Sequence, residues 1–176
     1  MIISISGWAG TGKSTTATKL ADVLGYHYYS GGSLFRAFAK EQGIHLLALE
    51  EQARIDPSFD KDLDAYQAKL GTEKDAFVIE SRLGWYFIPH AVSVKLACDD
   101  EVRFKRISQR ENKTVEQIKA ETLERETAIT DRYWNYYKIR DFMDDDNFDL
   151  VIDTAHHDIE ATVRLIIDYL ENHGQK

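Results

Sequence analysis

The chain has a single cysteine, Cys98, among its 176 residues. One cysteine cannot form an intrachain disulfide, and the amino terminus lacks the charged, apolar and small-residue segments of a secretory signal. Long apolar runs are scarce as well, because charged residues interrupt each of them within about ten residues, whereas a membrane helix needs ~20. We therefore expect a cytoplasmic protein with no membrane partner.

Proline is rare, with only two residues, and the sequence has no repeat, linker or low-complexity tract. Aromatic residues are plentiful by contrast, since 3 Trp, 9 Tyr and 8 Phe contribute to a hydrophobic share of 43%. This composition can fill a sizeable core and argues against intrinsic disorder. Because domains usually have about 100 to 200 residues, we predict that residues 1–176 form a single domain, and we expect a monomer.

Positive charge is in short supply: 22 Lys and Arg face 30 Asp and Glu, for a net charge of −8. A chain this acidic is a poor general binder of nucleic acid, so no nucleic-acid partner is expected. The exception is residues 101–140, which carry ten Lys and Arg against seven Asp and Glu. This basic segment indicates either a solvated helical face or a site for an anion.

Five short apolar runs predict strands, and segments with helical periodicity separate them. Strands that alternate with helices form a parallel sheet covered on both faces. We therefore predict an α/β fold with a three-layer core around a five-stranded parallel sheet. The predicted strands are residues 1–6, 26–30, 76–80, 92–98 and 149–153, and the helices that flank the first and last of them are residues 14–24 and 159–171.

A helical insertion follows the second predicted strand. Asp56 and Pro57 are a favourable N-cap and first helical residue, and Gly71 is the expected stop of the same helix. The helices predicted in this insertion are residues 33–42, 46–54 and 56–70. We predict that residues 33–71 form an arm beside the core.

A second helical stretch, residues 106–146, is too long for a simple crossover and ends in an acidic run. Because it holds most of the basic segment, we predict that it forms a lid. The remaining residues, 1–32, 72–105 and 147–176, would make up the core.

The strongest signal is a phosphate-binding loop that fits the pattern G-x-x-x-x-G-K-[ST] between a strand and a helix. Its backbone N–H groups and the N-terminus of the next helix can surround a β-phosphate. Lys13 would bridge the β- and γ-phosphates of ATP, and the Ser14 hydroxyl would ligate Mg²⁺. The residues expected to bind ATP here are Gly7, Trp8, Ala9, Gly10, Thr11, Gly12, Lys13, Ser14 and Thr15.

Two arginines are placed to hold an anionic acceptor. Arg36 lies one helical turn after Ser30 and Gly31, and Arg82 follows the third strand at the carboxyl edge, where open α/β sheets bind ligands. A guanidinium fork matches a phosphate in two places, which is why phosphoryl-transfer sites favour arginine. Surface ion pairs are the alternative for each. Glu80, at the end of the third strand, either orients a Mg²⁺-bound water or takes part in an ion pair or helix cap.

Four further arginines lie in the predicted lid. Arg106 and Arg110 are four residues apart, and Arg125 and Arg132 are seven apart, so each pair can share one helix face. Lid closure would bring them to the phosphoryl group, neutralise its charge and exclude water. The alternative is a set of solvated charges paired with Glu121, Glu124 and Glu126.

Recognition of the acceptor base is less clearly marked. Asp62, Asp64 and Gln67 are predicted to share one side of the third arm helix, where they would either read a nucleobase edge or be solvated. No general base stands out, and none is needed if the acceptor is a phosphate monoester that is already ionised near neutral pH.

With these features the sequence resembles the nucleoside monophosphate kinases, and most closely the short archaeal-type cytidylate kinase family. The likeness spans nearly the whole chain. Two positions depart from the family pattern: Ser81 replaces a common Gly, and Trp8 occupies a position where small residues or Pro are usual. The matching segments are residues 2–14, Tyr29–Gly32 with Phe35 and Arg36, Asp60–Lys61 with Asp64 and Gln67, Arg82 with Gly84 and Trp85, Arg106–Ile107 with Arg110, Arg125 with Arg132 and Tyr133, and residues 149–154.

The resemblance implies a P-loop core with an arm for the nucleoside monophosphate and a lid, and transfer of phosphate from ATP to CMP or dCMP with Mg²⁺. It implies that Arg36 and Arg82 hold the acceptor phosphate and that Arg106 lies against the donor adenine. Arg110, Arg125 and Arg132 would meet the phosphates. The residues expected to be catalytic are Lys13, Arg125 and Arg132, and those expected to bind the monophosphate are Ser30, Gly31, Arg36, Asp64, Gln67 and Arg82.

Three alternatives remain open from the residues alone. Another nucleoside monophosphate kinase, of adenylate, uridylate or thymidylate type, would use the same loop. A kinase that acts on an alcohol, such as shikimate kinase, needs a partner for the acceptor hydroxyl, and the sequence does not mark one. A nucleotide-dependent switch or assembly factor needs no acceptor clamp, so Arg36 and Arg82 favour a kinase.

Overall fold

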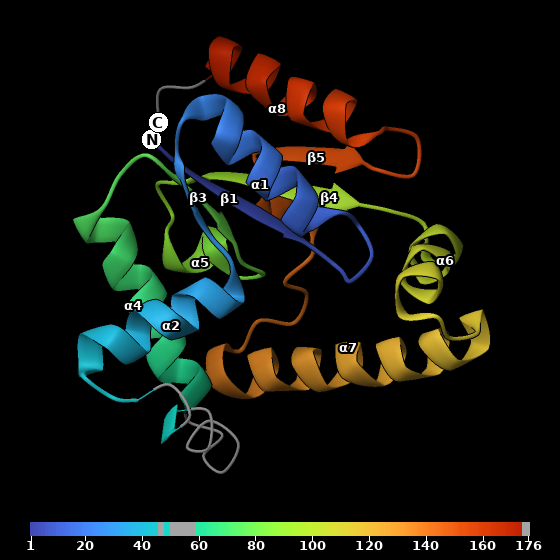
Figure 1. Ribbon diagram of the computed structural model, residues 1–176, viewed down its shortest axis with the longest axis horizontal. Coiled ribbons are helices and arrows are strands. Elements are labelled where there is room, and N and C mark those ends of the chain that lie inside the picture. Colours follow the sequence, from blue (N-terminus) through green and yellow to red (C-terminus); the bar gives the residue numbers. More distant parts are fainter. Residues whose placement is uncertain (46–47, 50–58, 174–176) are drawn as a thin grey trace.

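The structure is a computed structural model that describes residues 1–45, 48–49 and 59–173. Its centre is a five-stranded sheet in which all neighbouring strands run parallel, in the order β2-β3-β1-β4-β5 (Figure 1). The predicted α/β class and all five predicted strands are confirmed, with bounds that differ by one or two residues. The strands are β1 (Ile2–Gly7), β2 (His27–Tyr29), β3 (Phe77–Glu80), β4 (Val92–Ala97) and β5 (Leu150–Asp153).

Helices cover both faces of this sheet. Every residue of β1 is buried, as expected for a central parallel strand between two helical layers. Apolar side chains of α1 and α8 pack on one face of the sheet, and those of α2, α4 and α5 pack on the other. The described helices are α1 (Lys13–Leu24), α2 (Gly31–Gln42), α4 (Phe59–Glu73), α5 (Gly84–Phe87), α6 (Asp100–Glu111), α7 (Val115–Tyr137), the 3₁₀ turn η1 (Asp145–Asn147) and α8 (Ile159–His173).

Gly71 does not end its helix, so that expectation is wrong. Helix α4 continues through it to Glu73. A Cβ atom at Gly71 would lie 2.7 Å from Cγ2 of Ile88, which shows that glycine serves here to let α4 approach α5 closely. The predicted helix at 46–54 and the predicted start at Asp56 and Pro57 lie largely outside the described residues.

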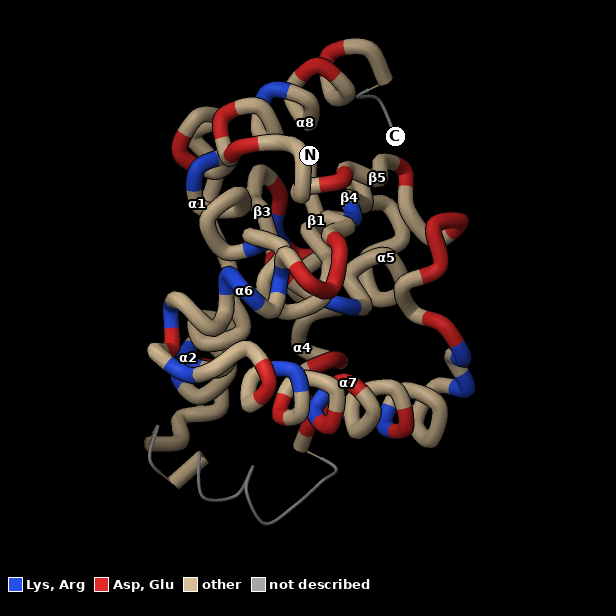
Figure 2. The backbone as a smooth tube through the Cα atoms, turned by 90° about the vertical axis from the view of Figure 1, so that its right-hand side faces the viewer, with Lys and Arg blue, Asp and Glu red and all other residues tan. Residues whose placement is uncertain are grey.

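The second predicted insertion consists mainly of two helices. Asn112 ends α6 in the left-handed conformation with φ of 55°, and Thr114 caps α7 by accepting a hydrogen bond from the Gln117 amide. Helix α7 then runs below the sheet from α6 at one end to α4 at the other (Figure 1). Acidic and basic residues are intermixed along it (Figure 2). Within the described part of the chain, no helix combines the length and apolarity needed to cross a bilayer.

Candidate active site

The phosphate loop connects β1 to α1 through two glycines with positive φ, Gly10 at 84° and Gly12 at 87°. Gly12 is also the N-cap of α1, and it has no side chain to cap the helix. The first amide groups of α1 therefore remain available to an anion at the loop. Residues with a Cβ atom rarely adopt this backbone conformation, which explains the glycines of the motif.

Lys13 folds back over the loop. Its Nζ donates a hydrogen bond to the Trp8 carbonyl oxygen at 2.8 Å. Burial lowers the pKa of Lys13 to about 8, the negative charge of Glu80 opposes this shift, and the positive charge of Arg82 adds to it. An anion at the loop would further favour the charged form of the amine and raise its pKa again, so the site favours a phosphate ligand.

Ser14 and Glu80 form the oxygen-rich side of the site. The Ser14 hydroxyl donates to Oε2 of Glu80 at 2.8 Å, and the Tyr28 hydroxyl donates to the same oxygen at 3.0 Å. Burial and the negative charge of Glu80 raise the pKa of Tyr28 to about 12, so its hydroxyl stays a donor at neutral pH.

This donor set suits Mg²⁺, which prefers oxygen ligands and usually takes few from the protein, filling its remaining positions with phosphate and water. Among the described residues, no three or more His, Cys, Asp or Glu side chains converge on a common point.

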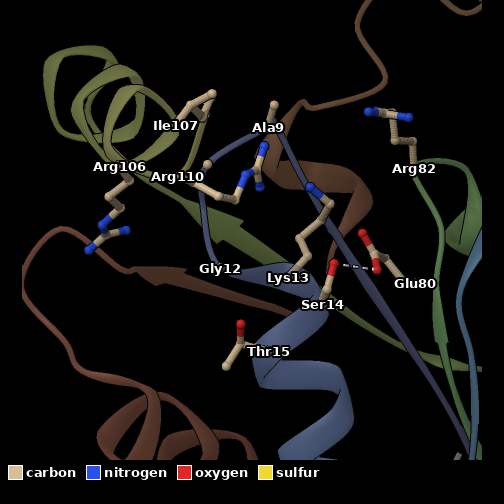
Figure 3. A pocket seen from close by; sticks show the side chains of 11 residues that line it. Ala9, Gly12, Lys13, Ser14, Thr15, Glu80, Arg82, Arg106, Ile107 and Arg110 are labelled. Carbon is tan, nitrogen blue, oxygen red and sulfur yellow. Dashed lines mark hydrogen bonds between the residues drawn. The ribbon is translucent and has the colours of Figure 1, made fainter. Parts of the chain in front are cut away.

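A cavity of about 360 Å³ opens above the loop (Figure 3). Four cationic side chains and a single carboxylate, that of Glu80, line it. This excess of positive charge indicates a polyanionic ligand such as a triphosphate. The lining residues are Ala9, Gly10, Gly12, Lys13, Ser14, Thr15, Glu80, Arg82, Arg106, Ile107 and Arg110.

Arg106 and Arg110 both reach this cavity from α6. Arg106 is held at the end of β5, where its Nη2 donates to the Thr154 carbonyl oxygen at 2.7 Å. The Thr154 hydroxyl in turn donates to the Thr11 carbonyl oxygen at 3.1 Å, so Arg106 is linked to the loop. Arg110 is more exposed, with 67% of its side chain accessible to solvent, and it pairs with Glu111 at 2.8 Å.

The two predicted acceptor arginines differ in their surroundings. Arg82 lines the cavity, and its Nε atom is buried without a hydrogen-bond partner among the described residues. A buried donor of this kind is costly unless a ligand satisfies it. Arg36 is exposed near the start of α2, which Ser30 caps, and it is not among the residues that line the cavity.

The predicted pair on α7 does not meet at the cavity. Arg125 is exposed, and the guanidinium of Arg132 forms an ion pair with Asp60 of α4. The side-chain contacts of α7 with α4 come from Arg132, Tyr136 and Tyr137, in the carboxyl-terminal half of α7. Glu126, which the alternative interpretation treats as a solvated partner of the lid arginines, pairs with Arg103.

On α4, Asp64 and Gln67 face the protein, whereas Asp62 is exposed. Asp62 therefore does not share their side of the helix, because two residues correspond to about 200° of rotation. Oδ2 of Asp64 accepts a hydrogen bond from the Tyr137 hydroxyl at 2.7 Å. Burial raises the pKa of Asp64 to about 6, against the opposing effects of Tyr137 and Arg132.

Residues 2–156 match the profile of the cytidylate kinase-like family. The chain belongs to this family. It is 41% identical over 176 residues to a cytidylate kinase of Haloarcula marismortui, covering 99% of this chain and 91% of that protein. It is 38% identical to a cytidylate kinase of Methanobrevibacter smithii, covering 97% of this chain and 99% of the relative.

Solved structures agree with the family at the level of fold. An uncharacterized protein from Eubacterium ventriosum superposes with a TM-score of 0.78 at 21% identity, covering 98% of this chain and 99% of that one. Shikimate kinase from Acinetobacter baumannii, solved in complex with shikimate, gives a TM-score of 0.64 at 17% identity, with 99% and 95% coverage. At such low identities these similarities show the shared P-loop kinase fold alone.

The two departures from the cytidylate kinase pattern are accommodated by local packing. The Trp8 ring meets Phe142 edge-on, with 4.9 Å between ring centroids. Oγ of Ser81 accepts a hydrogen bond from the Leu83 amide at 3.3 Å. Neither side chain lines the cavity.

Three contacts that hold charged side chains near the site were not predicted from the sequence, although Asp60 itself lies in a segment that matches the family pattern. Tyr28 holds Glu80, Asp60 holds Arg132, and Arg103 holds Glu126. Asp60 lies four residues before Asp64, and Arg103 lies three before Arg106, so helical spacing would have placed both near known site residues. For Tyr28 the sequence carries no such signal.

Proposed function

We propose that this protein transfers the γ-phosphoryl group of ATP to the 5′-phosphate of CMP or dCMP, giving ADP and CDP or dCDP. The cavity at the phosphate loop carries this proposal, because Lys13, Arg82, Arg106 and Arg110 line it against a single carboxylate. Its membership of the cytidylate kinase-like family supports CMP as the acceptor.

In this proposal, Lys13 leaves the Trp8 carbonyl oxygen and binds the β- and γ-phosphates. An oxygen of the acceptor phosphate attacks the γ-phosphorus, and the bond from that phosphorus to the bridging oxygen of ADP breaks. The acceptor oxygen is already ionised, so no protein base is required. Lys13, Arg125 and Arg132 stabilise the negative charge on the transferred group, the last two after movement of α7.

Ser14 and Glu80 are proposed to hold Mg²⁺, Ser14 directly and Glu80 through a water molecule. When bound there, the ion neutralises charge on the β- and γ-phosphates. Arg106 would lie against the adenine of ATP, and Arg110 would contact its phosphates.

For the acceptor, we propose that Arg36 and Arg82 hold the phosphate and that Ser30 and Gly31 lie beside it. The orphaned Nε of Arg82 supports this role, since a phosphate oxygen would satisfy it. Asp64 and Gln67 would read the base, because a carboxylate accepts a hydrogen bond from the cytosine amino group. Uracil offers an acceptor at that position and should be disfavoured.

We also propose that residues 33–71 act as the monophosphate-binding arm and residues 106–146 as the lid. The protein would work as a cytoplasmic monomer without nucleic acid. Light scattering at assay concentration tests the oligomeric state.

The test of the function is a panel of six acceptors, CMP, dCMP, UMP, AMP, GMP and dTMP, at fixed Mg-ATP, with the product identified by chromatography. We expect the highest kcat/KM for CMP and dCMP. A preference for AMP, UMP or dTMP would show that the protein is a nucleoside monophosphate kinase of another type. ATP binding without transfer to any acceptor would favour a nucleotide-dependent switch.

A further inference from the structure

Arg103 of α6 is the most buried charged residue in the described part of the chain, with 2% of its surface exposed. Each of its three guanidinium nitrogens donates a hydrogen bond to a carboxylate. Nη1 and Nη2 donate to the two oxygens of Glu126 at 2.6 and 2.9 Å, and Nε donates to Asp100 at 2.8 Å. This two-pronged geometry fixes α7 to α6 more specifically than a single contact would.

The backbone of Arg103 also supports the phosphate loop. A Cβ atom at Gly10 would lie 2.6 Å from the Arg103 carbonyl oxygen and 2.9 Å from its Cβ. The loop thus packs directly on the residue whose side chain holds α7. Ala9 extends this contact, since it packs against Phe104, Ile107 and Ile118 of the same two helices.

The other half of α7 is attached to the acceptor side. Arg132 pairs with Asp60, the Tyr137 hydroxyl binds Asp64, and Lys61 lies 4.5 Å from the centre of the Tyr136 ring. All three partners are on α4. Figure 1 shows the resulting arrangement, in which α7 runs from α6 beside the donor loop to α4 in the arm.

We propose that Arg103 and Glu126 are positioning residues that anchor α7 to the phosphate loop, so that ATP binding at the loop and CMP binding at the arm strengthen each other. This inference rests on the proposed CMP kinase activity. A ligand that orders the loop also orders Arg103 and, through Glu126, the helix that holds the arm. Arg125, the neighbour of Glu126, is carried with it.

The choice of variants follows from the burial of the pair. Glu126→Gln removes the negative charge with little change of shape. Arg103→Lys keeps the positive charge but cannot form the paired hydrogen bonds that the guanidinium makes to Glu126. If either single variant fails to fold, the double variant Arg103→Met/Glu126→Met carries the test, because apolar replacement of a buried ion pair often preserves stability. The matched control is Glu121→Gln, which breaks the exposed Lys113–Glu121 contact between the segment after α6 and α7.

The measurement is the Kd of CMP by calorimetry, without and with the non-hydrolysable analogue adenylyl imidodiphosphate and Mg²⁺, alongside kcat and both KM values. For the wild type and Glu121→Gln, we expect the analogue to tighten CMP binding by about fivefold or more. For the anchor variants, we expect this ratio to approach one and kcat to fall by about tenfold, with a smaller change in the KM for ATP. A residue that only stabilised the fold would lower the melting temperature without removing the coupling.

Three results would overturn the inference. The first is a wild type without coupling between the two ligands, and the second is a folded double Met variant with wild-type coupling and kcat. The third is an equal loss in Glu121→Gln, because the effect would then belong to any contact between these segments. A wild type that does not phosphorylate CMP would overturn the proposed function itself, and that assay distinguishes the two failures.

Discussion

The hydroxyl group of Tyr137 donates a hydrogen bond to the carboxylate of Asp64 across 2.7 Å, and so joins α7 to α4. The bond occupies Oδ2 of Asp64 and leaves the other carboxylate oxygen to accept from a ligand. It also opposes the effect of burial, which raises the pKa of Asp64 from 3.8 to about 6. Asp64 is therefore a carboxylate at neutral pH and becomes protonated in mild acid.

The first prediction concerns pH. If ionised Asp64 accepts from the cytosine amino group, kcat/KM for CMP should fall as the pH drops through about 6, since the protonated acid loses that acceptor. The phosphate of CMP titrates in the same range, so the informative quantity is the ratio of wild type to Asp64→Asn between pH 5 and 8. We expect that ratio to fall by up to about tenfold per pH unit below 6. A constant ratio would remove Asp64 from base recognition.

Titration of Asp64 should also make the stability of the folded protein depend on pH, in a direction that its pKa shift fixes. The pKa of Asp64 in the folded protein, about 6, lies above its ordinary value of 3.8. The folded state therefore binds more protons than the unfolded state between these values, and stability should decrease as the pH rises from about 4 to 6. In the Asp64→Asn variant, the free energy of unfolding measured by urea titration should lack this decrease between about pH 4 and 6. An identical slope in both proteins would contradict the assigned shift.

Lys13→Ala should abolish most of the turnover while the protein remains folded. The amine is the only lysine in the loop, and loss of one preorganised charge at a transferring phosphate typically costs about 10²–10³ in kcat. Its hydrogen bond to the Trp8 carbonyl oxygen should contribute only about 1 kcal/mol to stability. Steady-state kinetics and thermal melting test both statements. Lys19→Ala, an exposed change on the same helix, is the control and should behave as wild type.

Arg36→Ala should raise the KM for CMP by about ten- to a hundredfold, the effect of losing one charge-assisted hydrogen bond. The KM for ATP should stay near the wild-type value, because Arg36 is exposed and does not line the cavity at the phosphate loop. Arg82→Ala should raise the KM for CMP similarly and also reduce kcat, since Arg82 lies in that cavity. Initial rates with each substrate varied in turn separate these effects. If only the KM for ATP rose in these variants, the assignment of the donor and acceptor sites would have to be reversed.

Removal of Mg²⁺ by a chelator should stop the reaction, and added Mg²⁺ should restore it. Glu80→Gln should raise the Mg²⁺ concentration needed for half-maximal activity, and Tyr28→Phe should do so to a lesser degree, because the Tyr28 hydroxyl only orients that carboxylate. Activity titrations with Mg²⁺ at constant ATP measure the shift. If Glu80→Gln titrates as wild type does, Glu80 takes no part in holding the ion.

Gly71→Ala should destabilise the protein by about 1–3 kcal/mol, the usual effect of overpacking. The added Cβ would lie 2.7 Å from Ile88, at the contact between α4 and α5. Urea unfolding provides the measurement. Gly31→Ala is the matched control for stability, because a Cβ at that position meets nothing within 4 Å.

Much of the fold follows from local patterns in the chain. Buried strands such as β1 and β4 are mostly apolar runs. The loop between β1 and α1 is a contiguous motif whose glycines have a local conformational role. Gly71 shows where such reasoning is wrong, because glycine after a helical pattern suggests the end of a helix. Here a glycine is required because a Cβ atom would clash with Ile88, which is distant in the sequence.

The sequence by itself determined the parallel α/β class, the phosphate loop with Lys13 and Ser14, and the presence of Arg106 and Arg110 at one site, because each depends on residues close together in the chain. Only the tertiary structure decided the partners of the charged side chains. Arg132 meets Asp60 from 72 residues away, and Arg103 meets Glu126 from 23 residues away. Many carboxylates along the chain could satisfy an arginine equally well, and the packing of α7 against α6 and α4 selects among them.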